Sequence, residues 1–432
     1  MFDLVIRAGN APDIGIEGEF IAAVGHDLPS GKHEIDATRL AILPGMIDAH
    51  VHFNEPGRTD WEGAQTGSGA LAAGGGTLFV DMPLNSSPCT VNAKNFDAKR
   101  AALETSSITD FALWGGIVPG NLYDMEDLAE RGVVGFKAFM CDSGLAEFPR
   151  ADDGTLYFGM VEAARLNLPV AVHAESDEMT GKLSRRLLKE GRHDIPAFLE
   201  SRPVGAEVQA IRRAGAFARD TGCKLHIVHI SSGSGVAAAL EARAMGADIT
   251  LETCPHYLFF SEEDLLRIGA VAKCAPPLRS AAEREHLRQA AQHTEIDIIG
   301  SDHSPCPPDM KDRENFFEIW GGIAGVQSTI PVLLDTGLSL ERIAATTATN
   351  PALRFNLKQR GALQPGNYAD IALVDAGGTT HVTEASLLHR HRTSPYAGCT
   401  LKGKVVRTIR RGETIFSEGV VTAQTRGRFV HA

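Results

Sequence analysis

The sequence predicts an α/β fold: a (β/α)8 barrel of the TIM type, with a small β-sandwich domain formed by both termini. Two observations lead to this prediction. Between residues 43 and 302, short apolar runs rich in β-branched residues alternate with stretches that have the character of helices or loops. Near both ends of the chain, strand-like pieces follow one another without helices between them. We therefore expect a small β domain made of residues 1–47 plus 353–432, and a barrel made of residues 48–352.

The middle of the chain holds eight of these apolar runs, each with the length of a strand buried on both faces. They span residues 43–52, 77–82, 111–118, 133–140, 168–175, 224–231, 247–254 and 296–302. Eight strand and helix units in series match a closed parallel barrel. In the stretch 235–245, Val236, Leu240 and Ala244 stand four residues apart, which predicts a helix with one apolar face. A doubly wound open sheet is the alternative, but it would leave the polar strand ends without a shared focus.

The two ends of the chain predict shorter strands, outside the barrel. Such pieces span residues 3–6, 20–24, 370–374 and 403–416. The last piece alternates with a period of two, which is typical of half-buried strands, with Val405, Arg407 and Ile409 on one face and Val406, Thr408 and Arg410 on the other. Because neither end is long enough for a core of its own, we expect the two termini to pair into one β domain. The segment 379–397, which holds three histidines, fits neither pattern.

The composition indicates an ordinary globular protein with a large core. Of the 432 residues, 43% are hydrophobic and 22% are charged, far from the low hydrophobicity of disordered chains. The net charge of −12 and the lack of a basic patch disfavour nucleic acid and anionic membranes as partners. The start of the chain shows no charged leader with an apolar core, so we expect a cytoplasmic protein that acts on a small molecule. The seven cysteines lie scattered without a C-x-x-C pair and are expected to be free thiols.

Residues that commonly bind metal ions stand at the ends of several predicted strands. His50 and His52 close the first run and point the same way, because side chains alternate along a strand. Alone, such a pair is a weak signal, since two solvated histidines at a strand end are more common. Further residues of this kind lie late in the fourth, fifth, sixth and eighth runs: Lys137, His173, His229 and Asp302. In a barrel these positions converge on the C-terminal mouth, where active sites of this fold lie.

Lys137 interrupts the apolar run 133–140 without an acidic neighbour in the strand. Burying an unpaired ammonium costs several kcal/mol, so such a lysine normally has a lowered pKa instead. The alternative is a lysine whose side chain extends to the rim of the barrel. Beside a cationic site, a neutral amine can add carbon dioxide and become a carbamate, whose two oxygens can bridge two ions. We therefore expect Lys137 to be carboxylated.

The remaining candidates each have a structural alternative. His173 and His229 interrupt strong strands and could be core histidines bonded to backbone carbonyls. That reading suits His226, which strand parity turns away from His229. Asp302 could be an N-cap, or it could bind one ion while exchanging a proton with the nucleophile. We favour the second role because five other residues of this kind accompany it.

Five motifs resemble those of the cyclic amidohydrolases, the group of dihydroorotases, hydantoinases and allantoinases. They are residues 44–52 (PGMIDAHVH), 135–137 (GFK), 254–257 (CPHY), 276–279 (PPLR) and 301–308 (SDHSPCPP), and the resemblance covers nearly the whole chain. It implies two divalent cations, with zinc favoured although cobalt, manganese and iron suit the same donors, and a homotetrameric enzyme. The metal ligands that it implies are His50, His52, carboxylated Lys137, His173, His229 and Asp302.

Within this group the sequence is most similar to allantoinases. Dihydroorotases have an arginine where Asn54 stands, and hydantoinases have a tyrosine shortly after the modified lysine, whereas residues 138–142 contain none. Residues 54–63 and the run after His303 resemble allantoinases, although Ala275 replaces a serine common in relatives. The resemblance implies ring opening of allantoin to allantoate, a step of purine nitrogen catabolism.

The implied mechanism uses a hydroxide held by two cations, which attacks the ring carbonyl while Asp302 moves the proton to the leaving nitrogen. Metal binding lowers the pKa of water from about 15.7 to about 7, roughly 12 kcal/mol of help. Asn54, Asn85 and Ser304 are candidates for ring contacts, with turn or cap roles equally open. Three alternatives remain: a hydantoinase, dihydropyrimidinase or dihydroorotase specificity; a barrel deaminase, which Lys137 disfavours; and an inactive interaction protein, in which the ligands would be eroded.

Overall fold

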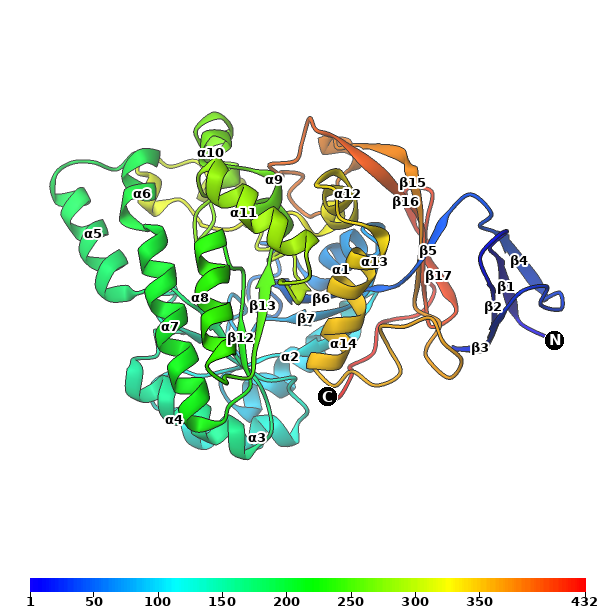
Figure 1. Cartoon of the computed structure of the whole chain (residues 1–432), viewed down its shortest axis with the longest axis horizontal. Coiled ribbons are helices and arrows are strands. Elements are labelled where there is room, and N and C mark those ends of the chain that lie inside the picture. Colours follow the sequence, from blue (N-terminus) through cyan, green and yellow to red (C-terminus); the bar gives the residue numbers. More distant parts are fainter.

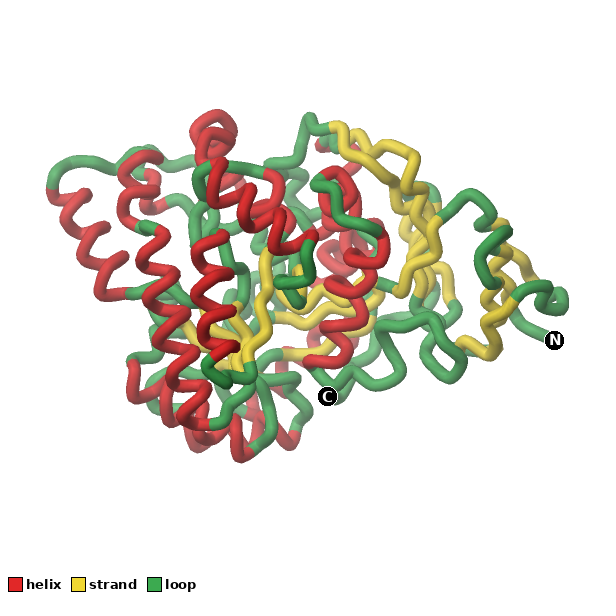
Figure 2. The backbone as a smooth tube through the Cα atoms, in the orientation of Figure 1, coloured by secondary structure: helices red, strands yellow, loops and turns green.

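The computed structural model describes residues 1–432, and helices and strands alternate through most of the chain (Figure 1). The helices lie on the outside of this α/β part, whereas the N-terminal end of the molecule consists of strands and loops (Figure 2). The α-helices are α1(Ala64–Ala73), α2(Ala93–Ser106), α3(Met125–Glu130), α4(Asp153–Arg165), α5(Asp177–Lys189), α6(Ile195–Ser201), α7(Val204–Thr221), α8(Gly233–Ala244), α9(Pro255–Phe259), α10(Glu262–Ile268), α11(Ala281–Gln292), α12(Thr329–Asp335), α13(Leu340–Ala344) and α14(Asn350–Arg354). None of them combines the length and the apolar character needed to cross a membrane.

All strands of the α/β part pair in parallel. One sheet has the order β6(Met46–Val51), β7(Gly76–Asp81), β8(Asp110–Leu113). The other has the order β14(Ile298–Ile299), β13(Ile249–Thr253), β12(Leu225–Ile227), β11(Val170–His173), β10(Phe136–Phe139), β9(Gly115–Gly116). Only Trp114 separates β8 from β9, and an isolated parallel bridge joins Val51 to His303, just after β14. Each of the eight predicted runs therefore contains parallel strand. The strands are shorter than their runs except β7, which has six residues like the run 77–82 but begins one residue earlier.

Two further sheets lie at the N-terminal end. One has the order β3(Phe20–Gly25), β2(Asp13–Glu17), β1(Leu4–Arg7), β4(His33–Asp36), and in it only β1 and β4 run parallel. The other is antiparallel, in the order β18(Val420–Val421), β17(Glu413–Ser417), β16(Thr400–Arg410), β15(Ile371–His381), β5(Ala41–Pro44). The pairing of β5 with β15 joins the N-terminal and C-terminal parts of the chain. Apolar side chains of both sheets, such as Ile14 and Ile409, belong to one buried cluster.

Several sequence predictions need correction here. The run 43–52 is two strands in different sheets, divided at Gly45, where a Cβ atom would lie 2.5 Å from the side chain of Thr77. The run 403–416 is also two strands, because the chain turns through positive φ at Arg411 and Gly412. Strands β2 and β4 have no counterpart among the predicted elements. The last residues leave the two terminal sheets and lie against β8, where the backbone N–H of Val430 donates to the carbonyl of Phe111 at 2.7 Å.

Helix α8 buries a different face from the predicted one. Ala244 is exposed and Leu240 is only half-buried, whereas Val236, Ala239 and Ala242 are buried. The reason is close packing against α7, where a Cβ atom on Gly215 would lie 2.5 Å from that of Ala242. Small residues therefore select the contact face, and the longer Leu240 is left at its edge.

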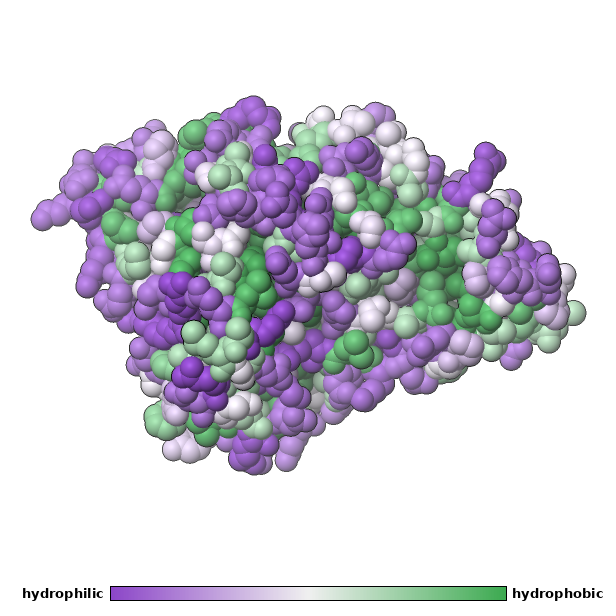
Figure 3. All heavy atoms as spheres, viewed as in Figure 1, coloured by the Kyte–Doolittle hydropathy of each residue, from purple (hydrophilic) through white to green (hydrophobic).

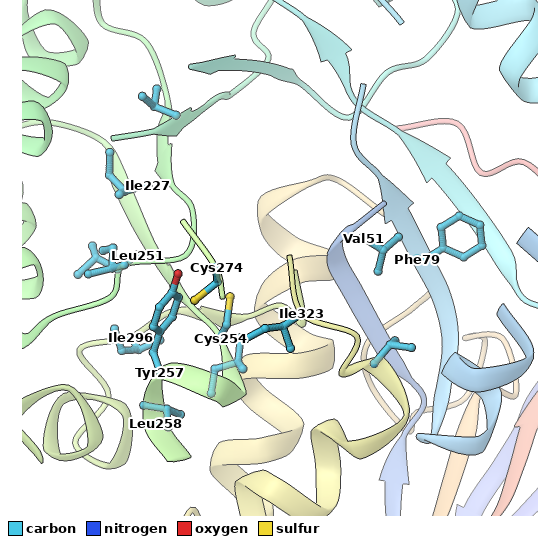
Figure 4. Packing of buried hydrophobic residues seen from close by; sticks show 14 of the residues in the cluster. Val51, Phe79, Ile227, Leu251, Cys254, Tyr257, Leu258, Cys274, Ile296 and Ile323 are labelled. Carbon is cyan, nitrogen blue, oxygen red and sulfur yellow. The ribbon is translucent and has the colours of Figure 1, made fainter. Parts of the chain in front are cut away.

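The core under the site is apolar and continuous. Side chains of α9 and the loop before α11 gather beside strands β12 and β13, and Cys254, Tyr257 and Cys274 lie close to one another (Figure 4). The hydroxyl of Tyr257 donates to the carbonyl of Pro276 at 2.6 Å, which holds the segment that contains Ala275. The face of the molecule shown in Figure 3 is mostly hydrophilic, with scattered apolar side chains.

Candidate metal centre and active site

The C-terminal ends of the parallel strands surround a cavity of about 500 Å³. His50 lies at the end of β6, His173 ends β11, and His229 and Asp302 follow β12 and β14. All four side chains, together with that of His52, line this cavity. Five of the six residues predicted from the strand ends therefore share one opening.

The tightest group of possible ligands is His50, His52 and Asp302. The Nε2 atoms of both histidines lie 3.3 Å from Oδ1 of Asp302. Burial raises the pKa of Asp302, but the two histidines hold it well below its usual range, so the carboxylate is anionic at neutral pH. No lysine or arginine forms an ion pair with Asp302. Two imidazole nitrogens and a carboxylate without a competing cation suit a divalent metal ion.

His173 and His229 extend this group across the cavity. Their ring centroids lie 4.5 Å apart, and the ring of His229 lies 5.4 Å from that of His50. Burial and the neighbouring His173 lower the pKa of His229 well below its ordinary value, which favours the neutral imidazole that binds metal ions. The Nδ1 atom of His229 is buried and has no hydrogen-bond partner.

Lys137 is completely buried in β10 and does not extend to the rim. Its Nζ atom has no hydrogen-bond partner and lies 5.1 Å from the centroid of the Phe139 ring. Burial lowers the pKa of Lys137 to about 8, although Glu252 and Asp302 act to raise it. Burial, with a smaller contribution from the positive charge of Lys137, lowers the pKa of His50, His173 and His229.

A buried carboxylate that the sequence reading missed holds three parts of the site together. Oε1 of Glu252 lies 2.8 Å from Nδ1 of His50 and accepts the backbone N–H of His229 at 3.3 Å. Oε2 lies 3.0 Å from Nε2 of His226. Burial raises the pKa of Glu252, but His50 and His226 bring it to about 2. Since the carboxylate only accepts, His50 carries its proton on Nδ1 and directs the lone pair of Nε2 toward Asp302.

Glu175 plays the same part for His173. Its Oε2 atom lies 2.7 Å from Nε2 of His173 and forms an ion pair with Arg202. Burial raises the pKa of Glu175, but Arg202 and His173 bring it to about 2. Cys141, His173 and Glu175 also form a ligand-like group, but burial raises the pKa of Cys141 to about 12, so it stays a thiol. With Arg202 already paired to Glu175, this second group has no need of a metal cation.

The candidates for ring contacts separate into two kinds. Asn85 and Ser304 line the cavity, and Nδ2 of Asn85 donates to Oγ of Ser304 at 3.3 Å. Asn54 does not line it; its Nδ2 donates to the carbonyl of Pro305 at 3.3 Å, while its Oδ1 is buried without a partner. Other lining residues that sequence reading missed include Arg202, Lys273 and Trp320.

The histidine expected to be structural lies outside the cavity. His226 has Nδ1 2.9 Å from Oγ1 of Thr250 and Nε2 beside Glu252, so both of its nitrogens have side-chain partners. Its ring stacks on Trp114, with centroids 6.3 Å apart. The direction away from His229 agrees with strand parity, although its partners are side chains rather than backbone carbonyls.

Comparison with known proteins agrees with this geometry. The Amidohydrolase family model matches residues 41–415, and the chain therefore belongs to the amidohydrolase family and is a hydrolase. An allantoinase of Solibacter usitatus is 58% identical over 99% of this chain and 95% of its own length. An allantoinase of Deinococcus radiodurans is 50% identical over 97% of this chain and 94% of its own length.

Comparison with solved structures indicates the same family. The L-hydantoinase (dihydropyrimidinase) from Arthrobacter aurescens has a TM-score of 0.97 at 31% identity, with all of both chains covered. The dihydropyrimidinase from Brevibacillus agri has a TM-score of 0.90 at 27% identity, over 99% of this chain and 97% of the other. The arrangement of His50, His52 and Asp302 thus lies in a fold shared with an L-hydantoinase and a dihydropyrimidinase.

We predict that Glu252→Gln weakens zinc binding by about 10- to 100-fold, because outer carboxylates orient metal-binding histidines and raise their basicity. The measurement is titration of zinc into metal-free protein. Glu283→Gln is the control, since Glu283 binds Ser234 instead of a site histidine. Equal zinc affinity in Glu252→Gln and the parent would contradict the role given to Glu252.

Proposed function

We propose that this chain opens the ring of allantoin by hydrolysis and releases allantoate. The observation that supports this most directly is its 40–58% identity to proteins named allantoinase, over at least 97% of the chain. The cavity supports it as well, because a buried cluster of imidazoles and a carboxylate lies in its wall. In the reaction the ring amide C–N bond breaks, and water supplies the hydroxyl of the new carboxyl group and the proton of the leaving nitrogen.

The proposed ligands suit a pair of divalent cations, with zinc favoured and cobalt, manganese and iron also compatible. The fit rests on the convergence of His50 and His52 on Asp302, and on the unpartnered Nδ1 of His229 and Nζ of Lys137. When bound, such cations lower the pKa of water from about 15.7 to about 7 and polarise a carbonyl oxygen. The proposed set is His50, His52, carboxylated Lys137, His173, His229 and Asp302.

Carboxylation of Lys137 follows from its surroundings. The lone pair of a neutral Nζ attacks carbon dioxide, an N–C bond forms, and the amine proton leaves to give the carbamate anion. Burial favours the neutral amine, and the unpartnered Nζ has no competing hydrogen bond to break. The product replaces a buried cation by an anion with two oxygens, which can bind two cations at once.

Asp302 is the residue that we propose to move the proton. Its carboxylate is anionic at neutral pH and lies in the cavity wall beside His50 and His52. From there it can accept a proton from the attacking water and deliver it to the leaving nitrogen. Asn85 and Ser304 line the same cavity and are proposed to contact the ring, whereas Asn54 supports the backbone at Pro305.

The finer features of the fold are also proposals. We infer that the parallel strands close into a barrel of eight, with β8 and β9 counted as one strand interrupted at Trp114. The closure would run through the Val51–His303 bridge, beside which the N–H of His52 donates to the carbonyl of His303 at 2.8 Å. Residues 1–47 plus 353–432 would then form a β-sandwich domain beside a barrel of residues 48–352, apart from the last few residues, which lie against Phe111 of β8. The apolar cluster shared by the two terminal sheets supports this division. The tetramer stays a prediction from the resemblance, and the cytoplasmic location stays a prediction from the sequence.

The nearest alternative is a hydantoinase or dihydropyrimidinase, which the TM-score of 0.97 to an L-hydantoinase favours. Both activities cleave the same kind of ring amide, so the parts of the cavity that contact the ring do not decide between them. The substituent on the ring does decide, because allantoin has a polar urea arm at the position where hydantoinase substrates carry other groups. Only 8 of the 27 residues that line the cavity are hydrophobic, which favours the polar arm.

We predict that the zinc-loaded protein hydrolyses allantoin with a kcat/KM at least about 10-fold above that for hydantoin, dihydrouracil or dihydroorotate, since even one methylene in a hydrophobic pocket contributes about 10- to 200-fold. Product analysis and metal content are measured on the same sample. A preference for hydantoin or dihydrouracil would support the alternative specificity. Ammonia release without ring opening would indicate a deaminase, and no turnover by metal-replete protein would indicate an interaction protein.

We predict that Asp302→Asn lowers kcat for allantoin by about 10²- to 10⁴-fold, because an amide cannot relay the proton. Circular dichroism and zinc content test whether the fold and the metal remain. Asp312→Asn, at an exposed position, should keep the parent's kcat. Turnover near that of the parent in Asp302→Asn would reject the proton-transfer role.

We predict a carbamate carbonyl resonance when the metal-loaded protein is prepared in isotope-labelled bicarbonate. Lys137→Ala should lose this resonance and most of its bound zinc, since the bridging oxygens are removed. Lys94→Ala, a change at an exposed lysine of α2, should keep both. An active, zinc-loaded parent without the resonance would mean that Lys137 stays an amine.

A further inference from the structure

One wall of the cavity is a long loop after β14. Residues 305–322, here called the cavity loop, leave at Ser304 and return at Ile323, where the N–H of Ser304 donates to the carbonyl of Ile323 at 2.9 Å. The cavity loop contains no strand and only two short 3-10 helices. The residues that it places in the cavity wall are Met310, Phe317, Glu318, Ile319, Trp320 and Gly321.

Lys273 binds this loop from outside it. The side chain is only 4% exposed, and Nζ donates to the carbonyls of Phe316 at 2.5 Å and Phe317 at 3.2 Å, and also to that of Ile319. The ammonium also lies 4.7 Å from the ring centroid of Phe198, within the range of a cation–π interaction. All three of its N–H groups therefore have acceptors on the loop.

Lys311 belongs to the cavity loop and binds in the opposite direction. Its Nζ donates to the carbonyl of Ala270 at 3.1 Å, and to those of Trp320 and Gly322 at 2.8 Å each. One bond ties the loop to the segment before Lys273, and two tie the loop to itself. Unlike Lys273, Lys311 does not line the cavity, so its effect on a ligand there must pass through the loop.

Hydration of the two ammonium groups does not explain why these positions carry lysine. Neither side chain has a carboxylate partner, and burial lowers the pKa of Lys273 to about 7 and that of Lys311 to about 8. Unlike Lys137, however, each Nζ faces three carbonyl oxygens, which match the three N–H donors of the ammonium form. Buried cations without counter-ions are costly, and apolar side chains could fill the same space. What the ammonium groups add is direction: each requires three carbonyl oxygens to point at it, which fixes the peptide planes between Phe316 and Gly322.

We propose that Lys273 and Lys311 are positioning residues that fix the cavity loop, so that Phe317, Trp320 and Gly321 form a preformed wall for the ring substrate. The inference deepens the proposed function, on which its kinetic test rests. A loop released from either lysine samples other peptide orientations, and the substrate must then order it on binding. The loss therefore falls on KM, while the proton transfer at Asp302 is unaffected.

The test is Lys311→Met in the zinc-loaded enzyme, assayed with allantoin. We expect KM to rise about tenfold while kcat changes less than about threefold. Trp320 provides a readout that does not depend on turnover. In a Trp61→Phe background the other tryptophan is the buried Trp114, so increased acrylamide quenching in Lys311→Met reports a loosened loop. Lys94→Met, at an exposed position outside the loop, should match the parent in both measurements.

The proposal requires both changes together. A folded Lys311→Met enzyme with unchanged KM, or with unchanged Trp320 quenching, overturns it, and so does a loss confined to kcat. If Lys311→Met does not fold, Lys311→Gln, which keeps two N–H donors, replaces it. The same two changes are then expected, a higher KM and increased Trp320 quenching, but both are smaller. If the parent does not open allantoin, the proposed function fails, and the quenching comparison alone decides whether the lysines fix the loop.

Discussion

The arrangement of the site depends on one buried carboxylate. Glu252 accepts from the imidazole of His50, from that of His226 and from the backbone of His229, so it connects β6, β12 and β13. An ionised carboxylate without water is stable only when several donors converge on it, because its desolvation costs several kcal/mol. The ends of these strands therefore have one permitted arrangement. In that arrangement Nε2 of His50 faces Asp302, and the candidate metal centre exists.

Much of this could be predicted from the sequence, for a local reason. Parallel strands buried on both faces are continuous apolar runs, so a polar residue such as Lys137 stands out within one. Strand parity then places His50 and His52 on one face, and turns His226 away from His229. Asn54, a candidate for a ring contact because of the resemblance, follows the strand but turns through a positive φ of 65°, and its amide donates to the carbonyl of Pro305.

The partners of these residues could not be predicted, because they come from distant parts of the chain. Glu252 lies 202 positions from His50, and Arg202 reaches Glu175 from a different helix end. A charged residue inside the run 247–254 was a usable signal for Glu252, since it needs a partner once buried. Nothing local indicates which partner. The face of α8 was likewise wrong, because close packing with α7 depends on Gly215, a residue of another helix.

Two kinds of buried charge surround the cavity. Glu175 and Glu252 accept from imidazoles and so concern the candidate metal centre. Lys273 and Lys311 donate to backbone carbonyls and so concern the cavity loop, six of whose side chains or backbone positions line the cavity. A fold matched at a TM-score of 0.97 over all of both chains, with only 31% identity, keeps the backbone while most side chains differ. Under the proposal above, substrate preference is therefore best sought in the side chains that the cavity loop presents rather than in the histidines.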